Sequence, residues 1–244
     1  MKMRTKISLI VASVVALFAS CNQNSSNLQN APTSSAPDSS EQGLIGSPFD
    51  LDDTTFYSAV EPFDDPGGLR IAGPNSSERI RACTSINGLS IAELEELMRP
   101  GQRDERTSKE GFLGPEERLL DVLAADNDLV NGMGLSHRDL AIPLLQICQR
   151  VNGRLNEGDD FEFDHANIRW RVECTVFMGS QLSPFNDQTK ASIDYTLTNL
   201  ENGESVSFSG LVPLMIERYG FYEGHGTPYR VEPTDIARVL GLTK

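Results

Sequence analysis

Residues 168–176 read IRWRVECTV, with an apolar side chain at every second position. Successive side chains of a strand point to opposite faces, so this alternation predicts a strand with one buried face. A second alternating run follows at residues 193–197, and Asn202-Gly203 is the signal of a tight hairpin. Together these patterns predict an antiparallel sheet of three or four strands.

The remaining sequence has the spacing and punctuation of helices. Residues 90–93 read SIAE, a capping-box pattern that opens a helix. Pro115 suits the first turn of a second helix, and Ser136 is placed to cap a third. Two more helices are expected near the end of the chain, at residues 211–219 and 234–240. We therefore expect an α+β fold in which a small antiparallel sheet packs against several helices.

Composition divides the chain into three parts. We expect a signal peptide at residues 1–20, an acylated and disordered tether at 21–47, and a single globular α+β domain at 48–244. Within the domain, a helical block occupies about 88–152, and the sheet and C-terminal helices occupy about 158–242.

The first part has the three sections of an export signal. Basic residues among the first six are followed by an apolar run at 7–18, which is too short to span a bilayer as a stable helix. The next segment, LFASC at 17–21, resembles the lipobox of bacterial lipoproteins, although Phe18 stands where that family usually has leucine. The resemblance implies cleavage before Cys21 and attachment of acyl chains, such as palmitate, to its thiol.

Two other interpretations of this segment stay open: an ordinary secretory signal cleaved nearby, and an uncleaved anchor. Either would also place the domain outside the cytoplasm. Under the lipoprotein resemblance, Asn22 is informative because aspartate at that position retains lipoproteins of enteric bacteria in the inner membrane. We expect a lipid-anchored protein of the cell envelope, at the outer membrane rather than the inner one if the source is Gram-negative.

The tether and the charge restrict the partners. Residues 22–47 are rich in Ser, Asn, Gln and Pro, and such a chain reaches on the order of 30 Å. The net charge is −14, and loss of residues 1–20, which hold three basic and no acidic residues, takes it to −17. Nucleic acids and anionic lipid surfaces repel such a polyanion, so we expect membrane contact only through the acyl chains on Cys21.

Three cysteines remain beside Cys21, which is an odd number for an oxidising compartment. We predict a disulfide between Cys148 and Cys174, because the first ends an apolar helix and the second lies within a strand. The alternative is that these two and Cys83 stay reduced and buried, since cysteine packs as a small apolar residue. A catalytic thiol is disfavoured because no histidine lies near any of them in sequence.

Residues 217–230 are the strongest candidate for a functional site, because they combine aromatic residues, glycines, one histidine and two arginines. In this hypothesis Tyr222, His225, Tyr229 and Arg230 bind a ligand, with Arg230 pairing with a carboxylate. The simpler interpretation, which the sequence favours, has the tyrosines packing on the sheet and residues 224–226 forming a surface turn.

Metal and cofactor sites are not expected. The three histidines, His137, His165 and His225, are far apart in sequence, and His137 is placed to face solvent in the first turn of its helix. The acidic segments lack the ligand spacing of a calcium loop, and no glycine-rich phosphate loop is present.

Residues 111–114, GFLG, and residues 207–233 resemble an uncharacterised family of small bacterial proteins over about 89–242. Members of that family carry a histidine where this chain has Tyr219, and a Cys-Pro-Phe triplet where residues 183–185 read SPF. The resemblance implies no activity. Both departures remove potential ligands, so this chain is not expected to bind a metal there even if its relatives do.

Two functional hypotheses remain. The favoured one is a non-catalytic envelope protein whose domain binds a peptide, glycan or protein partner through the sheet and residues 221–230. The alternative is an envelope hydrolase that uses His225 with a nearby acid, Glu223.

Overall fold

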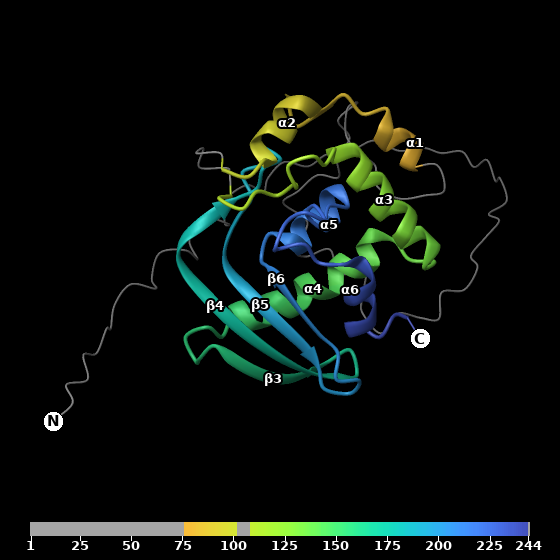
Figure 1. Ribbon diagram of the computed structural model, residues 1–244. Helices are drawn as coiled ribbons and strands as arrows, with labels where there is room; N and C mark the ends of the chain where they lie inside the picture. Colours follow the sequence, from red (N-terminus) through yellow and green to blue (C-terminus); the bar gives the residue numbers. More distant parts are fainter. Residues whose placement is uncertain (1–75, 102–107, 244) are drawn as a thin grey trace, which may run out of the picture. The chain divides into compact units, whose positions relative to one another are not determined.

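A computed structural model of the chain describes residues 76–101 and 108–243 (Figure 1). The predicted signal peptide, the acylation site at Cys21 and the tether lie outside these residues. The described residues belong to one compact unit and contain six helices and two antiparallel sheets. The prediction of an α+β fold is therefore confirmed.

The main sheet has four strands in the order β3-β4-β5-β6, all antiparallel. The strands are β3 (Asp160–His165), β4 (Ile168–Leu182), β5 (Lys190–Asn199) and β6 (Ser205–Ser209), and a small second sheet pairs β1 (Ser85–Ile86) with β2 (Leu89–Ser90). The strand count and the hairpin at Asn202-Gly203 agree with the sequence prediction.

The alternation at 168–176 buries one face of the sheet. Cross-strand pairing places four buried side chains in one row, Phe161, Val172, Leu197 and Val206. Burial of each such side chain contributes about 1.5–3 kcal/mol to folding, so this row specifies both the face and the register.

The helices are α1 (Ser76–Arg81), α2 (Ile91–Met98), α3 (Leu119–Gly132), α4 (His137–Asn152), α5 (Val212–Tyr219) and α6 (Pro233–Val239). Figure 1 shows α4, α5 and α6 gathered beside the sheet, and α6 contacts β5 and β6 directly. The hydroxyl of Tyr195 on β5 donates to Asn152 at the end of α4 over 2.6 Å. The helices thus cover the buried face that the alternation creates.

The sequence predicted the start of two helices correctly and the start of a third incorrectly. Ser90 and Ser136 each form a capping box, with Glu93 and Asp139 respectively. Pro115, in contrast, precedes α3 instead of beginning it. Arg99 donates to the carbonyl groups of Gly114 and Glu117, and those contacts hold residues 114–117 in a turn.

A large irregularity interrupts the pairing of β4 with β5. Pairing runs to Val176 opposite Ile193 and resumes at Gln181 opposite Ala191. Residues 177–180 therefore face only one residue of β5, which makes a β-bulge. Bulges bend a strand and redirect its side chains, and they are common beside functional sites.

None of the helices in the described part of the chain is long and apolar enough to cross a membrane.

Candidate functional site

Two loops far apart in sequence are locked together by glycines. The backbone amide of Gly224 donates to the carbonyl of Phe112 over 2.8 Å. A Cβ atom on Gly224 would lie 2.9 Å from the Cα of Leu113 and 2.1 Å from Oε2 of Glu117, and one on Gly226 would lie 2.8 Å from the Cα of Gly114. These glycines serve the close approach of two backbones. The two stretches that carry the family resemblance, 111–114 and 221–224, are thus in direct contact.

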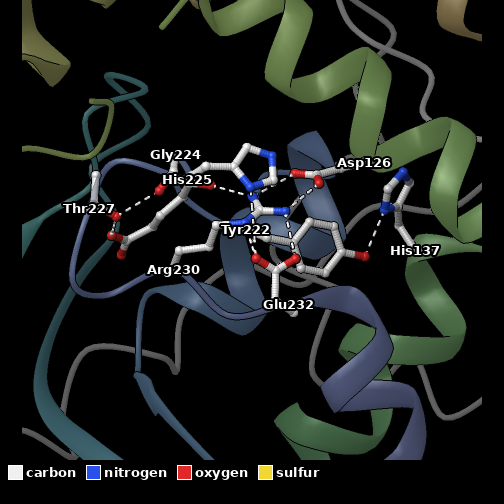
Figure 2. Close-up of polar contacts among 9 residues, drawn as sticks. Asp126, His137, Tyr222, Gly224, His225, Thr227, Arg230 and Glu232 are labelled. Atoms are coloured by element: carbon white, nitrogen blue, oxygen red, sulfur yellow. Dashed lines mark hydrogen bonds and ion pairs between the residues drawn. The ribbon is translucent and has the colours of Figure 1, made fainter. Parts of the chain in front are cut away.

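Arg230 is the centre of a buried ion-pair network (Figure 2). Its guanidinium donates to both carboxylate oxygens of Asp126, at 2.7 and 3.1 Å, and to both of Glu232, at 2.8 and 3.1 Å. A fifth bond, 2.6 Å long, goes to the carbonyl of Glu223. An arginine has five N–H donors, so all of them are used. Burial lowers the pKa of Arg230, but the hydrogen bonds that it donates to both carboxylates raise the pKa above its usual value. Arg230 does pair with carboxylates, as expected, but they belong to its own chain and leave it no donor for a ligand.

Tyr222 and His137 form a second buried contact. The hydroxyl of Tyr222 lies 2.8 Å from Nδ1 of His137, and both residues are almost fully buried. Burial lowers the pKa of His137 to about 4, so its ring is neutral at physiological pH. Two predictions are corrected: Tyr222 is inaccessible to a ligand, and His137 faces the interior. The reason is that the loop after α5 packs against the first turn of α4 and buries both side chains.

His225 lies at the surface, with 54% of its side chain exposed and its Nδ1 3.7 Å from Glu232. Figure 2 shows its ring above the Arg230 network. It thus belongs to the solvent-facing side of that network.

A cleft of about 310 Å³ lies where the bulge of β4 meets β5 and the loop after α5. Two members of the sequence-predicted segment, Glu223 and Tyr229, line it; His225 and Arg230 are not among the described residues that do. The remaining lining residues are Ser108, Gly111, Phe112, Phe177, Gly179, Ser180, Gln181, Ala191, Ser192, Ile193, Asp194 and Ser209.

The rim of the cleft is aromatic. Phe177 is 52% exposed and Tyr229 is 46% exposed, values that are large for such side chains in a packed domain. Phe177 belongs to the bulge, so the irregular pairing brings an aromatic ring to the cleft. The prediction that Tyr229 packs on the sheet as an ordinary core residue does not hold.

Glu223 is the most unusual residue of the cleft. It is only 2% exposed and has a left-handed backbone with φ of +68°. That conformation is costly for a residue with a side chain and is concentrated at functional sites. Burial raises the pKa of Glu223 to about 8, opposed by a hydrogen bond with Thr227 and reinforced by the charge of Asp194.

The side chain of Glu223 accepts a long hydrogen bond from Thr227. The hydroxyl of Thr227 lies 3.0 Å from the carbonyl of Gly224 and 3.4 Å from Oε2 of Glu223. A hydroxyl has one proton, and the shorter bond to the carbonyl takes it. The longer contact with Glu223 is therefore weak, and it opposes the rise in the pKa of Glu223 only in part.

Asp194 is the second acid of the cleft. It lies on β5, opposite Thr175 of β4 and Ser209 of β6. Burial raises its pKa as well. Sequence reasoning missed Asp194 and the bulge residues. The sequence does contain a signal for the bulge: the apolar alternation ends at Val176 and is followed by Phe177, Met178 and Gly179.

Cys148 and Cys174 are not reactive thiolates. Cys148 and Cys174 are both buried and have free thiols, so the predicted disulfide is absent from the structure. Burial raises the pKa of Cys174 to about 11, and the charge of Asp159 contributes to this rise. Burial also raises the pKa of Cys148, with a contribution from the nearby Cys174. The two thiols are thus close enough to interact. Both are protonated at neutral pH.

Tyr219 and the triplet at residues 183–185, where this chain departs from the resembled family, are in contact through Phe185. The ring of Phe185 stacks on that of Tyr219 with centroids 3.9 Å apart. In the described part of the chain, the structure contains no group of three or more side chains suited to hold a metal ion.

Comparison of the chain with protein-family models, with curated proteins and with solved structures finds no match. The cleft must therefore be interpreted from its own chemistry.

Proposed function

We propose that this protein is a lipid-anchored protein of the cell envelope whose exported domain binds a neutral glycan in the cleft. The observation that carries the proposal is the combination of exposed rings, hydroxyl groups and acids around one cavity of about 310 Å³. That volume is at the lower end of the range of small-molecule sites.

The lining suits the two kinds of surface that a sugar presents. The rings of Phe177 and Tyr229 offer flat apolar faces for the C–H groups of a pyranose. Hydroxyl groups of Ser180 and Ser192, with the carboxylate of Asp194, offer hydrogen-bond partners for sugar hydroxyls. An ordinary apolar ligand would leave these polar groups without partners, which is costly.

The charge of the cleft disfavours an anionic ligand. The cleft contains two acids, Asp194 and Glu223, and none of the residues that line it in the described part of the chain is basic. The expected mature charge of −17 adds a repulsive field around the whole domain. Anionic oligosaccharides and acidic peptides are therefore disfavoured.

The lipid anchor is supported by the sequence alone. Basic residues, an apolar run and small residues precede Cys21 in the order that lipoprotein processing requires. Labelled palmitate should enter the wild-type protein and not a Cys21→Ala variant. Equal incorporation into both proteins would refute the anchor without affecting the cleft.

The binding proposal is tested on a panel of neutral oligosaccharides, chito-oligosaccharides among them, with anionic oligosaccharides for comparison. For a neutral ligand that binds, Phe177→Ala should weaken affinity about tenfold, since loss of one ring contact costs about 1.4 kcal/mol. Met178→Ala is the matched control, because Met178 is a fully exposed neighbour in the same bulge and does not line the cleft. Equal affinities for both variants, or no neutral ligand, would refute the proposal.

The alternative hypothesis, a hydrolase based on His225, has no support from the geometry. His225 is exposed beside Glu232, whereas Glu223 is buried at the cleft.

A further inference from the structure

Two acidic residues of different character line the proposed binding cleft. Glu223 comes from the loop after α5 and is buried, whereas Asp194 comes from β5 and is partly accessible. Glycoside hydrolysis requires such a pair, with one acid that holds a proton and one that is ionised.

The surroundings of Glu223 favour its protonated form. The cation nearest to it in the loop, Arg230, binds its backbone carbonyl and spends its other donors on Asp126 and Glu232. The hydrogen-bond partner of its side chain among the described residues is the neutral Thr227.

Among the other charged groups around Glu223, Asp194 also favours protonation. On the facing loop, Glu117 approaches Gly224 with its carboxylate, which accepts the amide of Gly114 over 2.6 Å. On β5, Asp194 adds a second negative charge that acts on Glu223. The charge of Asp194 makes loss of the proton from Glu223 harder.

We propose that the cleft hydrolyses a glycosidic bond of the bound glycan, with Glu223 as the general acid and Asp194 as the general base. The inference rests on the proposed function, because the glycan must first bind in the cleft. It also replaces His225, which sequence reasoning paired with Glu223, by a residue on β5.

The reaction consumes one water molecule and needs no other reactant. Glu223 gives its proton to the glycosidic oxygen as the bond from that oxygen to the anomeric carbon breaks. Asp194 takes a proton from water, whose oxygen forms the new bond to the anomeric carbon. The products are a free sugar end and an alcohol, and solvent returns the proton from Asp194 to Glu223.

The test uses the full-length protein in detergent with a neutral oligosaccharide that the cleft binds. Release of reducing ends should fall about 10²–10⁴-fold in Glu223→Gln, which cannot donate a proton, and also in Asp194→Asn. Oligosaccharide affinity should change little, because both replacements keep the shape of the side chain. Glu201→Gln, in the exposed turn after β5, is the control and should leave the rate unchanged.

A second substrate separates a general acid from a structural role. An aryl glycoside with a good leaving group needs little protonation, so Glu223→Gln should lose far less activity on it than on the oligosaccharide. Equal losses on both substrates would refute the role of Glu223. The rate should also fall as the pH rises past about 8, where Glu223 loses its proton.

The outcomes distinguish this inference from the proposed function. If the wild-type protein binds neutral oligosaccharides but releases no reducing ends, the hydrolytic activity is refuted and the binding function stands. If no neutral oligosaccharide binds, both fail together.

Discussion

Replacing Arg230 with methionine should destabilise the domain strongly, because it leaves a buried negative charge unpaired. The change removes five hydrogen bonds and keeps most of the side-chain volume. Asp126, whose side chain is only 2% exposed, would lose its partner, whereas Glu232 is partly solvated. Removing one member of a buried ion pair costs about 3–5 kcal/mol.

The assay is thermal and denaturant unfolding of the Arg230→Met variant beside the wild type. For a domain of this size, the expected loss corresponds to a fall in Tm of about 6–20 °C. Arg238→Met is the control: Arg238 has a half-exposed side chain and ion pairs with Asp235 and Glu204. Its loss should cost about 0–1 kcal/mol, since surface pairs contribute little.

A double variant isolates the buried charge as the cause. Asp126→Leu combined with Arg230→Met removes both partners, so it should cost less than Arg230→Met alone. If Arg230→Met is as mild as the surface control, the network does not hold the loop as described. If the double variant is worse than the single one, the cost does not come from an unpaired charge.

Three further predictions concern the cleft loop and the thiols. The pKa of Glu223 is about 8 in the folded protein against an ordinary 4.5, so its neutral form stabilises the fold fully below about pH 4.5, and this stability is lost as the pH rises through 8. When unfolding is measured over this pH range, the Glu223→Gln variant should lack that decline in stability. Gly224→Ala should lower the Tm markedly, because its Cβ would lie 2.9 Å from the backbone Cα of Leu113 as well as overlapping Glu117. Gly158→Ala, with open space around it, should change the Tm little in the same melting experiment. Thiol counting in denaturant should find Cys148 and Cys174 reduced in protein kept under reducing conditions. In exported protein the count of free thiols should be three, the number in the described part of the structure; a count of one would show that the predicted disulfide forms there.

Local sequence patterns predicted the elements that depend on neighbouring residues. The alternation at 168–176 predicted β4, and the capping residues Ser90 and Ser136 predicted the starts of α2 and α4. Each of these signals acts within a few residues, through side-chain direction or a backbone hydrogen bond. Such patterns can therefore be interpreted without knowledge of the rest of the fold.

The candidate site depended on contacts that no local pattern contains. Arg230 and Asp126 are 104 residues apart in sequence. Because they pair, Arg230 is not available for the ligand-binding role that the composition of residues 217–230 suggested. The bulge that brings Phe177 to the cleft reflects a difference in pairing between β4 and β5. The segment 217–230 was a correct place to look, but only Glu223 and Tyr229 of it line the cleft.

The most direct test of the central claim follows the backbone amide NMR signals of the domain as a neutral oligosaccharide is added. If the glycan binds in the cleft, the shifts should concentrate at residues 177–181 and 191–194 and around Glu223 and Tyr229. The turn at residues 200–203, at the opposite end of β5, should stay unchanged and serves as an internal control. Shifts confined to other surfaces, or no saturable shifts at all, would contradict the assignment of the cleft as a glycan site.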